Sequence, residues 1–126
     1  MKVLLVKPNQ IPRAYDLEDS LDAMQALVGG SIQAVFPFQE PVALVCHEEG
    51  KLLGLPLNRA LSHPDTGEVY DIISGPFFLC AAREDSETFE SLTPAQIDTY
   101  TQQFYNPQQF IRTENGLIIF EEVRSV

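Results

Sequence analysis

Residues 28–61 constrain the fold of this chain more strongly than any other stretch. Ile32, Ala34 and Phe36 fall on one face of an extended segment, and residues 42–46 form an unbroken apolar run between turn residues. A short run of this kind predicts a strand that is buried on both faces. Polar and glycine residues then precede the leucine-rich segment 52–55. This order predicts a hairpin in which 42–46 pairs with 52–55 across a tight turn.

A first helix is predicted over residues 17–28. Large apolar side chains recur there at helical spacing, and several carboxylates lie near its start, where they favour the positive end of the helix dipole. Asp16 is the expected N-cap, and Gly29-Gly30 is the expected stop signal.

A second helix is predicted to begin at Pro94. Thr93 is the expected N-cap, and Gln96 stands three residues later, where it completes a capping box. Asn106-Pro107 ends the helix, because the residue before a proline avoids helical geometry.

The remaining apolar runs predict strands. One covers residues 3–6. Residues 70–73 and 77–82 predict either two short strands or one long strand, and we favour one long strand over 70–82 with a bulge at Gly75. Two closing strands, around 110–111 and 117–120, surround a turn at Asn115-Gly116. Because strands and helices do not alternate regularly, the chain is predicted to form a single α+β domain, residues 1–126, with two helices and a mixed or antiparallel sheet of about five to seven strands.

Charge limits the classes of partner. The chain has 8 basic and 18 acidic residues, a net charge of −10, which disfavours direct binding to nucleic acid or to an anionic membrane. No apolar run reaches the ~18 residues of a membrane span. Cys46 and Cys80 lie in apolar runs and are expected to be buried, reduced thiols. We therefore expect a cytoplasmic protein.

Few residues suggest catalysis. Gly29-Gly30 follows a helix instead of opening one, so it does not form a nucleotide-binding loop, and the cysteines and histidines lack the spacing of a metal site. A thiol nucleophile would have to be Cys46 or Cys80, with His47 or His63 as its base. No cofactor, metal or catalytic residue is assigned from the sequence.

Asn58-Arg59 is the most distinctive polar feature, because it follows a stiff apolar segment in a chain with few cations. An arginine at this position can bind a carboxylate or a phosphate through two parallel hydrogen bonds. One interpretation makes Asn58 and Arg59, with His63 and Tyr70, the polar rim of a pocket for a small anionic ligand. The alternative is a structural salt bridge from Arg59 to an acidic residue, Asp71 or Glu68.

Several segments together carry a family resemblance: LVGGSIQAV, EEGKLLGLPLNRAL, DIISGPFFLC, the Thr-Pro helix start and FIRTENGL. With them the chain, from about residue 1 to 116, resembles the small proteins catalogued as domain of unknown function 3846. The most specific parts are Gly29-Gly30, 49–51, Asn58-Arg59 and Gly75-Pro76. The resemblance implies a setting in phages, plasmids and the bacteria that carry them, and it implies no established activity.

Three hypotheses follow. The first is a non-enzymatic accessory protein of a mobile element that binds a host protein or a small anionic ligand. The alternative is an acidic mimic of nucleic acid that inhibits a host defence nuclease by presenting carboxylates in place of phosphates. A third hypothesis is a small hydrolase. Exposed strand edges also favour a homodimer.

Overall fold

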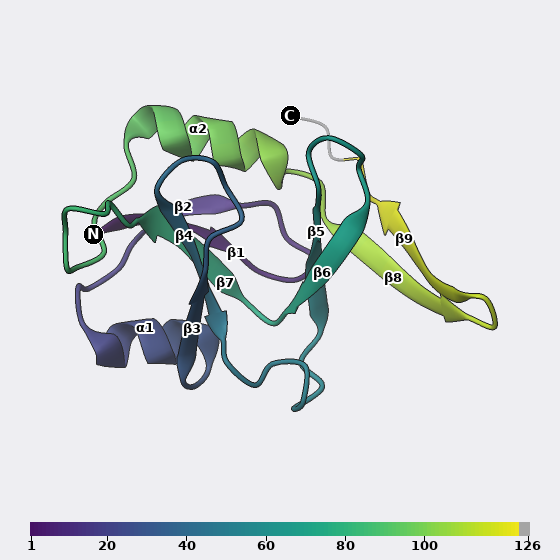
Figure 1. Ribbon diagram of the computed structural model, residues 1–126. Helices are drawn as coiled ribbons and strands as arrows, with labels where there is room; N and C mark the ends of the chain where they lie inside the picture. The colour runs from purple at the N-terminus through teal and green to yellow at the C-terminus, as the bar shows by residue number, and fades with distance from the viewer. Residues whose placement is uncertain (124–126) are drawn as a thin grey trace.

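The computed structural model describes residues 1–123 as a five-stranded antiparallel sheet with one helix on each face and two further hairpins (Figure 1). The main sheet has the order β2-β1-β7-β4-β3. Its strands are β1 (Lys2–Val6), β2 (Arg13–Asp16), β3 (Ile32–Val35), β4 (Val42–His47) and β7 (Phe77–Ala81). The helices are α1 (Leu21–Val28) and α2 (Pro94–Gln103), and the separate hairpins are β5 (Leu57–Ser62) with β6 (Val69–Ser74) and β8 (Gln108–Thr113) with β9 (Gly116–Glu121). The predicted α+β class is therefore confirmed.

The three central strands of the sheet, β1, β7 and β4, are buried on both faces. Leu4, Leu79 and Leu44 are cross-strand partners along one row of the sheet, and none of them is accessible to solvent. This confirms the double burial predicted for residues 42–46, which the unbroken apolar run indicated.

The two helices cover opposite faces of these strands. Tyr100 and Phe104, at the end of α2, pack with one set of alternating strand residues. Met24 and Val28 of α1 pack with the other set. Because successive strand residues point to opposite faces, an all-apolar strand such as β4 contributes to both cores at once.

Helix α1 begins one turn later than predicted. Ser20 is its N-cap, and the Ser20 hydroxyl accepts a hydrogen bond from the Ala23 N–H at 3.1 Å. The expected cap, Asp16, instead ends β2 and pairs with Lys2 across the sheet. The predicted stop is confirmed, because Gly29 adopts φ +91° and its N–H bonds to the Gln25 carbonyl.

The predicted hairpin between 42–46 and 52–55 is wrong. Strand β4 pairs with β3 and β7, and the leucine-rich segment is a turn in which Leu52 is 87% exposed. The next strand, β5, belongs to a different sheet. A central strand such as β4 needs a neighbouring strand on each side. The local turn pattern does not reveal that one of these neighbours is β7, which lies more than thirty residues further along the chain.

The predicted long strand over 70–82 is divided in two. Gly75 adopts φ +83°, which strongly favours glycine, and its N–H bonds to the Pro56 carbonyl at 2.7 Å. The chain therefore leaves β6 of one hairpin and enters β7 of the main sheet. Gly75 is a corner between two sheets and not a bulge within one strand.

The start of the second helix and the final hairpin follow the prediction closely, but the helix ends at Gln103, before the predicted stop at Asn106-Pro107. Thr93 and Gln96 bond reciprocally, with the Gln96 side chain 2.9 Å from the Thr93 N–H and the Thr93 hydroxyl 3.1 Å from the Gln96 N–H. In the final hairpin, the turn lies one residue earlier than the predicted Asn115-Gly116. Gly116 already begins β9, and the loop residues are 114–115.

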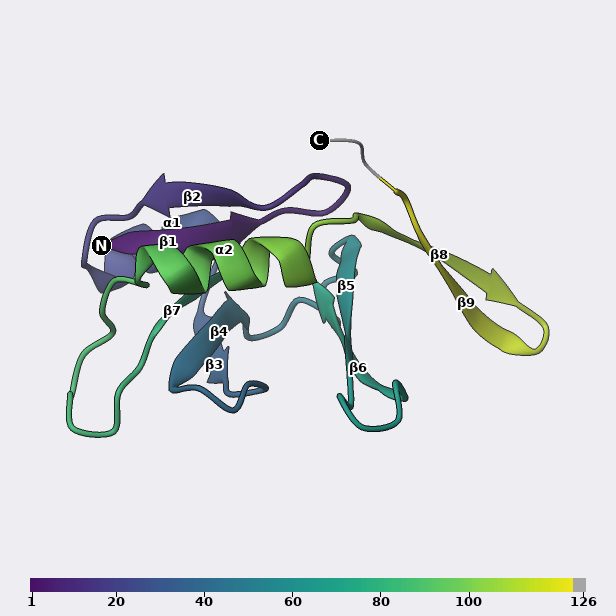
Figure 2. The same cartoon turned by 90° about the horizontal axis from the view of Figure 1, so that it is seen from above.

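The β8–β9 hairpin projects from the body of the molecule (Figure 2). Its attachment includes the Gln108 side chain, which accepts a hydrogen bond from the Ala60 N–H at 2.7 Å. Neither helix of the described chain has the length and apolar character needed to cross a bilayer.

Candidate binding groove

Arg59, the residue singled out from the sequence, is almost completely buried, with 1% of its surface exposed. Its guanidinium group binds backbone carbonyl groups: Nε and Nη2 donate to the Phe104 oxygen at 3.1 and 3.0 Å, and Nη2 donates to the Gln10 oxygen at 2.7 Å. Phe104 is the C-cap of α2, so Arg59 also places a positive charge at the negative end of that helix dipole.

Asn58 completes this arrangement. Its Oδ1 accepts from Arg59 Nη1 at 2.9 Å, and its Nδ2 donates to the carbonyls of Val6 and Gly75 at 2.9 and 2.8 Å. The pair therefore joins β1, β5, the corner at Gly75 and the end of α2. The salt bridge suggested for Arg59 is not made with Asp71, which pairs with Lys51 instead.

His63 and Tyr70 form a second pair. Both are exposed, and their rings stack with centroids 4.6 Å apart and planes 30° apart. The structure thus places the four residues as one buried pair and one exposed pair. None of them lines any of four surface cavities found in residues 1–123.

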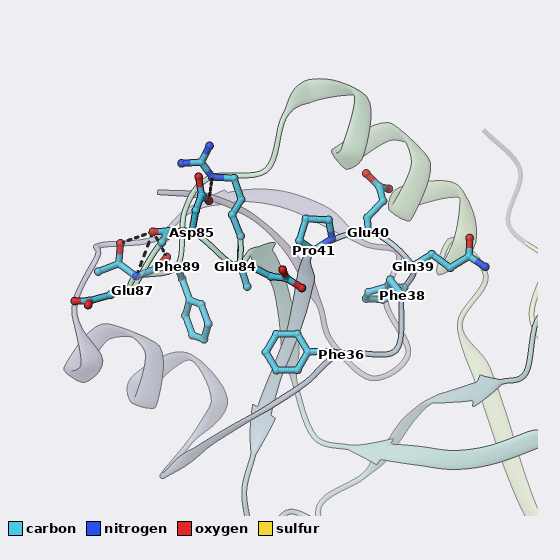
Figure 3. Close-up of a pocket in the computed structure, with 13 residues that line it drawn as sticks. Phe36, Phe38, Gln39, Glu40, Pro41, Glu84, Asp85, Glu87 and Phe89 are labelled. Carbon is cyan, nitrogen blue, oxygen red and sulfur yellow. Dashed lines mark hydrogen bonds and ion pairs between the residues drawn. The ribbon is translucent and has the colours of Figure 1, made fainter.

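The largest of these cavities lies elsewhere, between the loop 36–41 that joins β3 to β4 and the loop 82–89 that follows β7 (Figure 3). We call it the acidic groove. It has a volume of about 980 Å³ and is open to solvent. Its walls are adjacent because β4 pairs with β7, and the Ala82 N–H bonds to the Pro41 carbonyl at 2.8 Å.

Aromatic side chains provide the apolar surface of the acidic groove. Phe36 and Phe89 face the same hollow, beneath the carboxylate of Glu84 in the view of Figure 3. Phe36 is 62% exposed. A large apolar side chain left open to solvent inside a concave surface is typical of a binding site.

The rim of the acidic groove is negative. Its lining residues include four carboxylates and a single cation, and they are Glu40, Glu84, Asp85, Glu87 and Arg83. Arg83 is already paired: its Nε lies 3.0 Å from a Glu90 carboxylate oxygen and 3.6 Å from Asp85. The hydrogen bond to Glu90 and the charges of Asp85 and Glu90 raise the pKa of Arg83.

Glu40 anchors one wall of the groove to α2. Its carboxylate accepts hydrogen bonds from the Tyr100 hydroxyl at 2.9 Å and from the Gln96 side chain at 3.3 Å. Burial raises the pKa of Tyr100, and the bond to Glu40 raises it further, so the phenol stays protonated as a donor. The groove is therefore shaped by contacts that exist without a ligand.

A second cavity, of about 410 Å³, contains the residues that a thiol hydrolase would need. Cys46 and His47 both line it. Burial raises the pKa of the Cys46 thiol, however, and burial followed by the charge of Asp19 raises that of Cys80 to about 12. His47 Nδ1 is occupied as the acceptor of the Glu49 N–H at 2.9 Å. A nucleophilic thiol needs a lowered pKa, so neither cysteine has the electrostatic setting of a nucleophile.

Metal ligands are not gathered in residues 1–123, where no three His, Cys, Asp or Glu side chains lie close enough together to hold an ion.

The features that define the site are thus apolar surface and negative charge. Both belong to the part of the chain that a family model also recognises: residues 1–105 match the domain of unknown function DUF3846. The chain belongs to this family. No curated protein and no solved structure matches it.

The DUF3846 match includes both walls of the acidic groove and the buried Asn58-Arg59 pair. It ends before β8, so the projecting hairpin lies outside the matched residues. The sequence did not predict the groove. The only available signal was Phe36, an aromatic residue at the end of a predicted strand, and it does not show which loop lies opposite.

Proposed function

We propose that this protein is a non-enzymatic binding module whose acidic groove receives a positively charged segment of a partner protein. The observation that carries this proposal is the exposed Phe36 ring within a groove that is also lined by Glu84, Asp85 and Glu87. An apolar anchor surrounded by charge is the usual arrangement of a protein interface, because the anchor supplies affinity and the charges select the partner.

The charge of the groove favours a basic partner over the small anionic ligand. An anion in the groove would approach Glu84, Asp85 and Glu87, while Arg83 is engaged by Glu90. Lysine or arginine side chains of a partner would instead gain favourable Coulomb energy there, and the net charge of −10 would accelerate their encounter.

The family resemblance suggests the setting. We infer a cytoplasmic accessory protein of a mobile element that acts on a host protein, in keeping with phage and plasmid membership of the family. Acidic residues of two loops line the same groove, which also supports the narrower hypothesis of a nucleic-acid mimic that occupies the basic site of a host nuclease.

The experiment is capture of the partner from host extract, followed by calorimetry with the purified partner. Phe36→Ala should weaken binding by at least tenfold, and Glu84→Lys with Glu87→Lys should weaken it further and flatten its dependence on salt. The matched control is Asp65→Lys with Glu68→Lys, which makes the same charge change in the exposed turn between β5 and β6.

The control variant separates the effect of charge in the groove from the effect of the protein's net charge on binding. Equal loss of binding in the groove and control variants would show that only net charge matters, and this would overturn the proposal. Competition by double-stranded DNA for the captured partner would support the nucleic-acid mimic, whereas binding unaffected by DNA would exclude it.

A further inference from the structure

The projecting β8–β9 hairpin has two unlike faces. Cross-strand partners share a face, so Ile111 and Ile118 lie together with the neighbouring pair formed by Gln109 and Phe120. On this face Ile111, Ile118 and Phe120 are 44% to 51% exposed. The opposite face carries Phe110 and Ile119, which are half-buried. The hairpin therefore turns a stripe of large apolar side chains toward solvent.

Within β8 and β9 this exposed face carries no charged side chain, and Glu122, which follows β9 on the same face, accepts a hydrogen bond from Gln109 Nε2 at 2.9 Å. The three cross-strand pairs on this face are Gln109 with Phe120, Ile111 with Ile118, and Thr113 with Gly116. In a chain with a net charge of −10, most surfaces would repel a second copy. The three uncharged pairs are a region where two copies can approach without opposing carboxylates.

The hairpin also has an open edge. Among residues 1–123, β9 pairs with β8 alone. The Glu122 N–H donates a hydrogen bond to the Pro107 carbonyl at 2.7 Å. In an antiparallel pair, every second residue of a strand makes hydrogen bonds to the partner strand. The backbone groups of Ile118 and Phe120 therefore also bond to β8. The N–H and C=O groups of Leu117, Ile119 and Glu121 consequently point away from β8. Such an edge is a template for another strand.

We propose that this edge pairs with β9 of a second copy, so that two hairpins form one antiparallel four-stranded sheet. A two-fold axis at Ile118 places Phe120 opposite Gly116, where the absent side chain leaves room for the ring. An axis at Ile119 places Phe120 opposite Ile118, an aromatic–β-branched pair of the stabilising kind. In either register Glu121 does not face another carboxylate along the strand.

A second copy fits this edge because the pairing is self-complementary and closed. Each chain contributes the same six-residue strand, and the pairing uses the open edge of both copies, so assembly stops at the dimer. The sheet that results joins the exposed apolar stripes of both hairpins on one face. Because the interface is small, we expect a dissociation constant in the micromolar range.

Sedimentation equilibrium of the full chain over a concentration series tests this proposal. We expect a monomer of 14.1 kDa at low concentration to convert to a species of twice that mass. Ile118→Lys should weaken dimerisation at least tenfold, because it places two like charges in the joined sheet. The control Leu52→Lys adds the same charge at an exposed turn residue and should leave the constant unchanged.

Two further measurements locate the contact. Leu117→Pro removes an N–H that points away from β8, so it should also weaken the dimer, with folding checked by circular dichroism. In the wild type, amide exchange at Leu117 and Ile119 should slow as concentration rises. A monomer at all concentrations up to about 1 mM, a dimer indifferent to both variants, or an open polymer would each overturn the proposal.

Discussion

Arg59 donates two hydrogen bonds to the backbone carbonyl oxygen of Phe104, forty-five residues further along the chain. The carbonyl belongs to the C-cap of α2, and Arg59 itself belongs to the β5–β6 hairpin. This contact connects the helix that covers one face of the main sheet to a hairpin that lies outside that sheet. These hydrogen bonds explain why Arg59, although charged, is among the most completely buried side chains of the described residues.

Replacement of Arg59 should destabilise the fold. Arg59→Ala leaves buried carbonyl groups without donors and should lower the free energy of unfolding by about 3 kcal/mol. Arg59→Lys should recover only part of this, because an ammonium group cannot reproduce the fork of the guanidinium. Urea denaturation measures both. Arg112→Ala, at an exposed position, is the control, and an equal effect there would contradict the structural role of Arg59.

Gly30 and His47 form a close packing pair. A Cβ atom built on Gly30 would lie 3.1 Å from both Cδ2 and Cε1 of the His47 ring, and nearer still to Nε2. Gly30→Ala should therefore cost about 1–3 kcal/mol of stability. The double variant Gly30→Ala with His47→Ala should cost less than the sum of the two single changes. Additive losses in thermal unfolding would show that the two residues do not interact.

The capping box of α2 should make a measurable contribution. Thr93→Ala removes the acceptor of the Gln96 N–H and should lower the free energy of unfolding by about 1 kcal/mol. Thr99→Ala, at an exposed position inside the same helix, should change it by less than about 0.5 kcal/mol. Denaturant titration of the two variants provides the comparison, and equal effects would argue against the cap.

The buried thiol of Cys80 should make stability depend on pH. Its pKa is near 9.0 when unfolded and is raised to about 12 in the fold, so the unfolded state releases the proton first. The contribution of this thiol to the free energy of unfolding should be constant below pH 9 and then fall as pH rises, by up to about 1.4 kcal/mol per unit. Cys80→Ala should reduce this slope between pH 9 and 10.5. An unchanged slope would show that the thiol does not contribute.

Local sequence signals predicted the elements that depend on neighbours along the chain. Thr93 and Gln96 specify the start of α2 because both hydrogen bonds are made within four residues. Gly29 specifies the end of α1 through its left-handed conformation. The first turn of α1 was mispredicted because Asp16 and Ser20 are both good caps, and strand pairing with β1 removes Asp16 from the choice.

The candidate site was not predictable in the same way. Phe36 and Phe89 are separated by more than fifty residues and come together because β4 pairs with β7. Asn58 and Arg59 were recognised as distinctive polar residues, but their polarity alone did not distinguish a ligand site from a set of internal hydrogen bonds. Only the positions of the Val6, Gly75 and Phe104 carbonyls showed which contacts they make.

The sequence by itself determined the α+β class, the double burial of 42–46, the start of α2 and the hairpin at the C-terminal end, because hydrophobic period, capping and turn chemistry act over a few residues. The tertiary structure decided how strands join into separate sheets, where Gly75 turns the chain, and which loops enclose the acidic groove. These features depend on contacts between distant segments, and a one-dimensional pattern carries no information about which segments meet.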